Sequence, residues 1–433
     1  MGSRPLSLHT PLSFHEIARI GAKPSHMRIL LISQYFPPET GGTSNRMISL
    51  AQRFQARGHE VVVVAEKPNH PDGIIHAEYK GGLFEERAYQ GISVIYTWVY
   101  ARPEKSFVNR ILFYVSFMLT AILGAAKARG SFDVVLASSP PLFVGIAGWL
   151  AAKLKGAKYV FDVRDLWPEV AVAMGQLNQP VAVKAAEAME RFIYERADGI
   201  AAVTDSFCTH IEKIAGKDKP MVRVMNGTMP DVFAEDMRRE EVRQSLGVEE
   251  KFVVLYAGNL GLAQGLPHII DAAAALKEEP RVEFVLLGSG PVEEELKARK
   301  QHLGLDNVQF LDRVPLPEAA AHMAAADALL VPLGDNPIYQ QFIPSKLFDS
   351  MAAGRPVLLS VDGEARVLLD EAEGGLYYPA EDGTALAERI QWLLDHPGER
   401  EAMGRKGRAY ARTHCTRAAQ ADKMIDFVER LVQ

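Results

Sequence analysis

MRILLISQYFPPETGGTSNRMISLAQRFQARGHEVVVVA, residues Met27–Ala65, is the stretch from which the expected fold follows. It opens with an apolar run, passes through a Pro/Gly loop into an amphipathic segment with Met47, Leu50 and Phe54, and ends after Gly58 in a second apolar run. This order predicts a strand, a loop, a helix and a second strand. Because short Val/Ile/Leu runs separated by helices are typical of parallel sheets covered on both faces, the stretch predicts an α/β domain.

The same alternation continues through the rest of the chain. Further candidate strands of the first half are Ile92–Thr97, Val134–Ala137, Tyr159–Asp162 and Ile200–Val203. After the turn signal Asn226-Gly227 and a charged helical stretch at Met237–Leu246, the strand–helix rhythm restarts with FVVLYAGNLGLAQG and continues to PVLLSV. Two such sheets in one chain predict a ligand cleft between them, where the carboxyl ends of strands meet helix starts.

The composition limits the possible functions. The 433 residues are 48% hydrophobic and 24% charged with a formal net charge of −6, which argues against a general nucleic-acid binder. The two cysteines, Cys208 and Cys415, exclude a disulfide framework and a multi-cysteine zinc site and indicate a reducing compartment, the cytoplasm. The first 26 residues have neither the apolar core nor the cleavage site of a signal peptide.

One apolar segment breaks the pattern. Ile111–Ala126 is sixteen residues without a charge, flanked by Arg110 on one side and by Lys127 and Arg129 on the other. At about 1.5 Å per residue it spans roughly 24 Å, short of the ~30 Å hydrocarbon core of a bilayer. The segment is therefore either a buried core helix or an amphipathic helix that lies in a membrane surface, and composition leaves both open.

A lysine stands in the first turn of a predicted helix. In FIPSKLFDSMAAGRPVLL, Phe342–Leu359, Lys346 follows Pro-Ser directly before an apolar-periodic stretch. The helix dipole disfavours a cation at this end, whereas an ammonium together with free backbone N–H groups suits an anion such as phosphate. The alternative is an exposed Lys346 whose stem only covers apolar surface.

Three glycine-rich turns could approach a ligand closely. They are Gly41-Gly42, GNLGLAQG at Gly258–Gly265, and Gly288-Ser289-Gly290-Pro291. Glycine lets a backbone approach a phosphate or sugar without a Cβ in the way, although strand-to-helix turns also need glycine for local reasons.

Familiar nucleotide and metal motifs are missing from the sequence. Glu293 stands where the third glycine of G-x-G-x-x-G belongs, and G-x-x-x-x-G-K-[ST] does not occur. Neither H-E-x-x-H nor an Asp-x-Asp pair occurs either. We therefore expect a site that works without a metal or other cofactor.

Four ionisable side chains surround one tryptophan in FDVRDLWPE. Asp162, Arg164, Asp165 and Glu169 flank Trp167-Pro168 where a predicted strand ends. Charges at this end of a strand lie at the mouth of the cleft of an α/β domain. A surface Arg–Asp pair of little energetic consequence is the alternative.

Together these motifs resemble the retaining family-4 glycosyltransferases with the two-domain GT-B fold, from Met27 to the C-terminus. The matching pieces are YFPPETGGTSNR, DVRDLWPE, MNGTMPDVF, YAGNLGLAQG, LLGSGP, FLDRVP and IPSKLFDSMAAGRPV. The resemblance implies two Rossmann-like α/β domains that face each other across a cleft. The spellings RDLWPE, GNLGLAQG and IPSKLF look most like the branch that builds O-antigen, capsule and colanic acid. That branch commonly transfers N-acetylated amino sugars, such as fucosamine, to undecaprenyl-diphosphate-linked acceptors.

The resemblance also implies how the chain is divided. We expect a poorly ordered extension at residues 1–26 and an acceptor-binding Rossmann-like domain at residues 27–228. A nucleotide-sugar-binding Rossmann-like domain then occupies residues 229–413, and a C-terminal helix at residues 414–433 packs back on the N-terminal domain.

The sequence departs from the family pattern at charged positions. The Glu-x7-Glu element falls on Gln341 and Asp349, and the Arg and Lys that clamp the donor diphosphate fall on the neutral Asn259 and Gln264. The family's His near the acceptor aligns with Arg164. If Asn259 and Gln264 supply only hydrogen bonds, a cation must come from elsewhere, and Lys346 offers one.

Site residues follow from this alignment. Lys346, Asp165, Arg164 and Gln341 are expected to be catalytic. The expected donor-binding residues are Gly41, Gly42, Gly258, Asn259, Gln264, Gly288, Gly290, Arg313, Val314, Ser345, Lys346, Leu347 and Asp349. Asp349 is expected to bind the ribose hydroxyls of the nucleotide.

The expected function is retaining transfer of a sugar from a nucleotide diphosphate, more readily UDP than GDP, to a lipid-linked acceptor at the inner face of the cell membrane. Ile111–Ala126 would then contact the membrane surface, with Phe113, Phe117, Met118 and Leu119 in the interface. Two alternatives are a nucleotide-sugar epimerase of the same architecture and a non-catalytic nucleotide-sugar-binding protein. An epimerase needs acids and bases in the donor site, which the neutral Gln341 and Gln264 disfavour.

Overall fold

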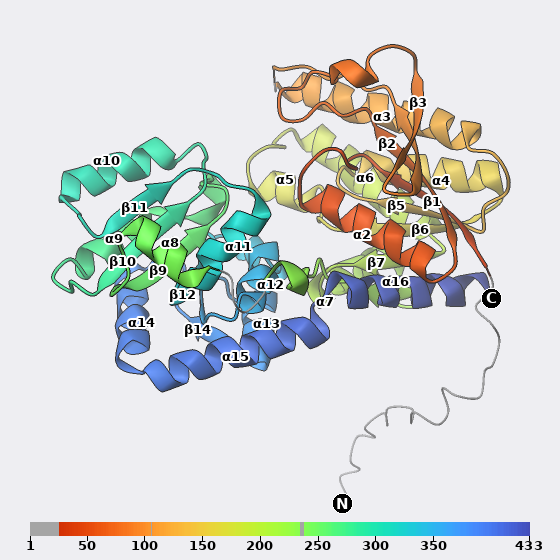
Figure 1. Cartoon of the computed structure of the whole chain (residues 1–433). Helices are drawn as coiled ribbons and strands as arrows, with labels where there is room; N and C mark the ends of the chain where they lie inside the picture. The colour runs from red at the N-terminus through yellow and green to blue at the C-terminus, as the bar shows by residue number, and fades with distance from the viewer. Residues whose placement is uncertain (1–25, 105, 234–237) are drawn as a thin grey trace, which may run out of the picture.

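The computed structural model describes residues 26–104, 106–233 and 238–433, which form two α/β domains side by side (Figure 1). The expected N-terminal extension, residues 1–26, lies outside the described residues except for its last residue. The predicted fold class is confirmed, because each domain is built on a largely parallel sheet with helices on both faces.

The N-terminal domain contains an eight-stranded sheet of order β3-β4-β2-β1-β5-β6-β7-β8. Its strands are β1 (Arg28–Ser33), β2 (Glu60–Glu66), β3 (Phe84–Tyr89), β4 (Ile92–Thr97), β5 (Val134–Ser138), β6 (Lys158–Val163), β7 (Gly199–Ala202) and β8 (Met221–Arg223). All pairs are parallel except β3 with β4. The helices are α2 (Gly42–Ala56), α3 (Phe107–Lys127), α4 (Phe143–Lys155), α5 (Glu169–Ala173), α6 (Pro180–Arg196), α7 (Asp205–Ala215) and, from the end of the chain, α16 (Arg417–Val432).

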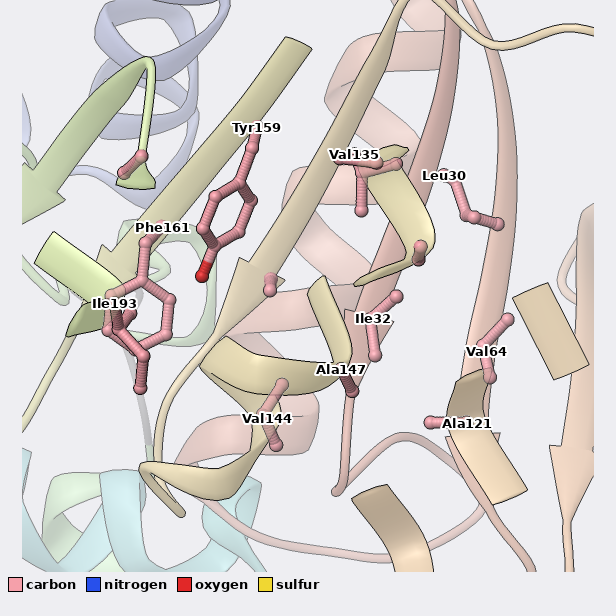
Figure 2. Packing of buried hydrophobic residues seen from close by; sticks show 14 of the residues in the cluster. Leu30, Ile32, Val64, Ala121, Val135, Val144, Ala147, Tyr159, Phe161 and Ile193 are labelled. Atoms are coloured by element: carbon pink, nitrogen blue, oxygen red, sulfur yellow. The ribbon is translucent and has the colours of Figure 1, made fainter. Parts of the chain in front are cut away.

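The alternation of side chains along β1 builds two cores, one on each face of the sheet. Ile29 and Leu31 pack in one cluster with residues of α2 and α16. Leu30 and Ile32 point to the other face, where α3, α4, α6 and α7 cover the sheet. Figure 2 shows this second cluster, with Leu30 and Ile32 near side chains of neighbouring strands and helices. Apolar residues on both faces of a strand explain why its sequence reads as a continuous apolar run.

The C-terminal domain contains a six-stranded, all-parallel sheet of order β11-β10-β9-β12-β13-β14. Its strands are β9 (Phe252–Ala257), β10 (Val282–Leu287), β11 (Val308–Leu311), β12 (Ala328–Val331), β13 (Val357–Leu359) and β14 (Gly375–Tyr377). Its helices are α8 (Arg239–Leu246), α9 (Pro267–Ala275), α10 (Glu293–Leu303), α11 (Leu316–Ala325), α12 (Ser345–Ala352), α13 (Glu364–Ala372), α14 (Gly383–Asp395) and α15 (Pro397–His414). The strand order reverses between β9 and β12, and doubly wound sheets bind ligands at such a reversal.

The apolar segment proposed as Ile111–Ala126 is α3, which begins earlier and has two different faces. Phe117, Ala121 and Ala125 are fully buried against the N-terminal sheet. The opposite face carries an exposed apolar stripe, Val108, Leu112, Leu119 and Leu123, whose members are 44–63% exposed. Neither alternative describes the whole helix, and the expectation that Phe117 enters a membrane surface is wrong because its ring lies in the core. Among the described residues, α3 is the one helix long and apolar enough to cross a membrane by length and composition.

The chain crosses between the domains twice, and α16 returns it to the N-terminal domain (Figure 1). Met424, Ile425 and Val428 of α16 are fully buried in the cluster that also contains side chains of α2. At the surface of the same contact, Arg53 of α2 donates two hydrogen bonds to the carboxylate of Asp422, at 2.8 and 2.7 Å. A segment from the end of the sequence therefore completes the core of the first domain.

Removing a buried side chain from α16 should destabilise the N-terminal domain. Met424→Ala leaves a cavity next to α2, and a change of this kind costs about 2–5 kcal/mol. The thermal midpoint of the N-terminal domain, followed by calorimetry, should fall by about 5 °C or more. The exposed neighbour in Lys423→Ala is the control and should leave the midpoint nearly unchanged. Equal midpoints for Met424→Ala and the parent chain would show that α16 is not part of this core.

Candidate active site

The carboxyl ends of β9, β10 and β12 and the start of α12 enclose a cavity of about 320 Å³ in the C-terminal domain. It lies at the reversal of the strand order. Seven of the expected donor-binding residues line it, namely Gly258, Asn259, Gly288, Arg313, Val314, Lys346 and Asp349. Residues predicted from four separate motifs are thus brought together around one cavity.

Lys346 lies in the first turn of α12 and reaches back over β9. Its ammonium donates a hydrogen bond to the Tyr256 hydroxyl and lies 4.3 Å from the centre of the Tyr256 ring. Burial lowers the pKa of Lys346 to about 8. Among the described residues, no carboxylate lies within ion-pair distance of this ammonium. Lys346 is therefore a partly desolvated cation that borders a cavity without an acidic partner.

Gly258 is the residue over which Lys346 passes. A Cβ atom at this position would lie 2.3 Å from the Lys346 Cε and 2.5 Å from its Nζ, and the φ angle of Gly258 is +151°. Its N–H group donates to the carbonyl of Leu287 at 2.9 Å, so it continues the sheet. Glycine is required here for the approach of the lysine, and the amide of Gly258 is already occupied.

The second pair of glycines has a packing role. A Cβ atom at Gly288 would lie 1.8 Å from the Gly258 carbonyl oxygen, and one at Gly290 would lie 2.3 Å from the Leu260 carbonyl oxygen. Both glycines let two loops pack backbone against backbone. Gly288 borders the cavity in addition, whereas Gly290 does not line it.

Asn259 and Gln264, the neutral residues expected near the donor diphosphate, lie at different distances from the cavity. Asn259 lines the cavity, but Gln264 does not. Both side chains converge on their own loop, since a Cβ atom at Gly261 would lie 2.6 Å from Asn259 Nδ2 and 2.6 Å from Gln264 Oε1. The buried Gln264 Oε1 has no hydrogen-bond partner. This loop leaves Lys346 and Arg313 as the cations that line the cavity.

Asp349 connects the cavity to the segment that joins the domains. Its Oδ1 accepts a hydrogen bond of 2.7 Å from the Thr228 hydroxyl. Burial raises the pKa of Asp349, while the Thr228 hydrogen bond and the charge of Arg417 oppose the rise. One carboxylate oxygen is thus engaged by the protein, and the expected contact to ribose hydroxyls stays a prediction.

Ser345, Leu347 and Gln341 lie outside the cavity lining. The Leu347 side chain is fully buried in the C-terminal core, and Ser345 is the first residue of α12. Gln341 instead contacts the other domain, because its Nε2 donates to Glu169 Oε1 at 3.2 Å and its carbonyl accepts from the Thr204 hydroxyl at 2.9 Å. A carboxylate at position 341 would face Glu169, so the neutral glutamine suits this contact.

Gly41 and Gly42 stand at the start of α2 in the N-terminal domain, where Gly41 precedes the helix. A Cβ atom at either position would meet nothing within 4 Å. The space around this turn is open to a ligand, but the turn is not part of the C-terminal cavity.

Arg164 and Asp165 follow β6 in the N-terminal domain. The Nε and Nη1 atoms of Arg164 are buried without a hydrogen-bond partner, and burial together with the charge of Arg46 lowers its pKa to about 10. Burial raises the pKa of Asp165 to about 6, and Arg164 partly offsets this rise. These two residues are electrostatically coupled.

The sequence did not reveal two further arginines at the same place. Arg46 of α2 lies 3.0 Å from the buried Asp162 carboxylate and donates to the Met225 carbonyl at 2.7 Å. Arg417 opens α16, and its buried Nε and Nη1 atoms have no hydrogen-bond partner. Burial lowers the pKa of Arg417, with Asp349 and Arg46 as its charged neighbours. Arg46 stands inside the YFPPETGGTSNR motif, whereas no local signal marks Arg417.

The amino-acid sequence of the chain is similar to those of two bacterial proteins that are named as glycosyltransferases. Over 344 residues, the chain is 25% identical to the putative colanic acid biosynthesis glycosyl transferase WcaI of Escherichia coli, covering 78% of this chain and 84% of that protein. Over 289 residues it is 27% identical to the probable glycosyltransferase WbjE of Pseudomonas aeruginosa, covering 65% and 70%.

Solved structures share its architecture. Sucrose-phosphate synthase from Thermosynechococcus elongatus superposes with a TM-score of 0.73 at 21% identity, covering 94% of this chain and 99% of that chain. HepE of Anabaena, solved in complex with UDP-glucose, superposes with a TM-score of 0.68 at 18% identity, covering 93% and 99%. These likenesses show the GT-B fold.

Two family matches divide the chain where the two sheets do. Residues 41–227 match the family Glycosyl transferase 4-like domain, and residues 238–410 match Glycosyl transferases group 1. The chain therefore belongs to the glycosyltransferases that join a glycosyl transferase 4-like domain to a group 1 domain.

Proposed function

We propose that this glycosyltransferase moves a sugar, with retention of configuration, from a nucleotide diphosphate to a lipid-linked acceptor such as an undecaprenyl diphosphate glycan. The ammonium of Lys346 carries the proposal, because it borders the cavity at the strand-order reversal and pairs with no carboxylate among the described residues. A diphosphate supplies the anion that this cation lacks. The UDP-glucose in the structure of HepE supports a UDP-linked donor.

The chemistry proposed for the donor site is stabilisation of a leaving group. The bond between the sugar C1 and the diphosphate oxygen breaks, and the acceptor hydroxyl bonds to C1 on the same face of the ring. The hydroxyl proton passes to the leaving diphosphate. Negative charge grows on the diphosphate as the bond breaks, and a preorganised cation in a partly desolvated site stabilises that charge more than water does. No metal or other cofactor is part of the proposal.

Residues of the other domain would face the sugar and the acceptor. Arg164 presents buried N–H groups without partners, and Asp165 is beside it with a pKa of about 6. At neutral pH this carboxyl is largely ionised and can accept a hydrogen bond from a hydroxyl group. We assign Arg164 and Asp165 to the positioning of the acceptor and of the transferred sugar.

An N-acetylated amino sugar is the transferred group that we propose, on the resemblance to the O-antigen, capsule and colanic acid branch. The colanic acid relative supports that branch by its name. An epimerase is disfavoured by the cavity itself, whose ionisable lining side chains are Arg313, Lys346 and Asp349. Asp349 is bonded to Thr228 through one oxygen, so this lining offers a single carboxylate, already partly engaged, as an acid or base for epimerisation.

Contact with the inner face of the cell membrane is a second part of the proposal. Helix α3 lies on the face of the N-terminal sheet opposite α16, near the top of Figure 1, and its exposed stripe is the side turned away from the sheet. Lys127 and Arg129 follow the end of this stripe, and Lys127 is paired with Glu86 at 2.8 Å. Apolar side chains bordered by cations suit the surface of an anionic bilayer. This contact would bring the enzyme to an acceptor whose tail is held in the membrane.

Loss of the Lys346 ammonium should abolish most of the transfer. We expect Lys346→Ala to lower kcat/KM by about 100- to 1000-fold, as removal of one transition-state stabiliser typically does. The measurement is acceptor-dependent UDP release from a panel of UDP-sugars, with a lipid extract of the source organism's membranes as acceptor. The exposed Lys277 is the control, and Lys277→Ala should match the parent chain. UDP release that does not need the lipid extract, or near-normal kcat/KM in Lys346→Ala, would contradict the proposal.

Charge placed on the exposed stripe of α3 should prevent membrane binding. In flotation with anionic vesicles the parent chain should rise, whereas Leu119→Glu with Leu123→Glu should stay at the bottom because two carboxylates face the lipid. The control, Val181→Glu with Val367→Glu, carries the same charges on exposed positions elsewhere and should still rise. If the parent chain itself does not float, the proposed membrane contact of α3 is wrong.

A further inference from the structure

A second cavity, of about 280 Å³, lies in the N-terminal domain at the carboxyl ends of β1 and β2 and beside the start of α3. It shares no lining residue with the cavity of about 320 Å³ in the C-terminal domain, where we propose that the donor binds. We call it the tyrosine pocket, after Tyr35 and Tyr114, which line it together with Glu66 and Arg110. None of these four residues belongs to the motifs that suggested the donor site, apart from Tyr35 at the start of YFPPETGGTSNR.

The floor of the tyrosine pocket is a buried carboxyl group. Glu66 is 2% exposed and accepts hydrogen bonds from Gln34 Nε2 at 2.7 Å and from Asn69 Nδ2 at 3.0 Å. Burial holds the pKa of Glu66 well above its usual range. The buried Gln34 Oε1 has no partner. A carboxyl group has room for about four hydrogen bonds, so this floor can engage further hydroxyl groups.

The wall of the pocket is aromatic and carries its own hydroxyl groups. The hydroxyl groups of Tyr35 and Tyr114 are near each other, and burial raises the pKa of both. Phe113 lines the same cavity. Aromatic faces suit the C–H faces of a sugar ring while the tyrosine hydroxyls and the acid below suit its O–H groups, so the chemistry of the pocket fits a polyol.

A row of rings connects this pocket to the charged motif after β6. Tyr114 lies 6.2 Å from Phe143, and Phe143 lies 6.4 Å from Trp167, measured between ring centres. Trp167 follows Arg164 and Asp165 by two to three positions. The charge of Asp165 contributes to the raised pKa of Tyr114, after the larger effect of burial. The pocket is therefore next to the residues assigned to the acceptor.

The rim of the pocket is cationic and leads to an exposed aromatic side chain at the start of α3. Arg110 and Arg102 line the rim together with one acid, Glu104, and neither arginine forms an ion pair within the described residues. Arg110 donates to Gln176 Oε1 at 3.1 Å. Phe107, three residues before Arg110 and on the same side of α3, is 52% exposed. A polyol pocket, a cation and an exposed apolar side chain thus lie on one side of the start of α3.

We infer that the tyrosine pocket binds the terminal sugar of a glycosyl phosphate lipid, with Arg110 at the phosphate and the lipid chain leaving past Phe107 at the start of α3. This assignment rests on the proposed function and names the acceptor site within it. Glu66 and the two tyrosines recognise hydroxyl groups, and Arg110 recognises the phosphate by charge-assisted hydrogen bonds. The donor nucleotide remains in the C-terminal cavity.

The test separates acceptor binding from donor binding. In the UDP-release assay with the lipid extract, Arg110→Gln should raise the acceptor KM roughly tenfold, as loss of a hydrogen bond to a charged group does, and leave the donor KM unchanged. Glu66→Gln keeps the shape of the floor and should raise the acceptor KM as well. Arg191→Gln makes the same charge change at an exposed position of α6 and should behave as the parent chain.

The possible outcomes distinguish failure of the tyrosine pocket from failure of the proposed function. An unchanged acceptor KM in Arg110→Gln and Glu66→Gln, with transfer intact, overturns the tyrosine pocket and leaves the proposed function standing. An equal rise of the acceptor KM in Arg191→Gln, or an equal rise of the donor KM, also overturns it. A parent chain that transfers no sugar to any lipid fraction overturns the proposed function, and the acceptor assignment falls with it.

Discussion

The pairing of the two chain crossings, at Thr228 and Thr416, is the constraint on which the site depends. The Thr228 N–H donates to the Cys415 carbonyl at 2.7 Å, and the Arg417 N–H donates to the Thr228 carbonyl at 2.8 Å. The Thr228 hydroxyl then holds Asp349 at the wall of the C-terminal cavity. One residue therefore ties together both crossings and the cavity, and it brings the start of α16 to the cleft. The core contact of α16 with α2 secures this arrangement from the other side.

Around these crossings the protein gathers cations that it does not neutralise itself. Lys346 comes from α12, Arg164 from the end of β6 and Arg417 from the start of α16, and burial lowers the pKa of each. Burying a charge without a partner costs free energy, which a ligand of opposite charge recovers on binding. Three carboxylates are near these cations. Burial raises the pKa of Asp349 and Asp165, and Asp162 is already paired with Arg46 at 3.0 Å, so they offset the cations only in part.

The fold could be predicted from the sequence because strands and helices leave patterns within short stretches of sequence. Continuous apolar runs such as that of β1 result from burial on both faces, and they alternate with amphipathic helices throughout the chain. Lys346 was recognisable for the same reason, since its position in a helix start needs no knowledge of distant residues. The environments of individual side chains could not be predicted in this way, because they depend on how the segments pack in three dimensions. Phe117 is buried because α3 turns that face to the sheet, Gln264 folds into its own loop, and Arg417 and Glu66 acquire their surroundings from segments far away in sequence.

The central claim, that Lys346 is a desolvated cation held for the donor diphosphate, is tested most directly by the pH dependence of UDP affinity. The free ammonium has a pKa of about 8 because burial disfavours its charge, and bound diphosphate raises that pKa again. UDP should therefore bind progressively more weakly as pH rises from about 7 to about 9.5, since the deprotonated enzyme must first take up a proton. Lys346→Arg keeps its charge over this range and should show a flat profile by calorimetry. A flat profile in the parent chain as well would contradict the account.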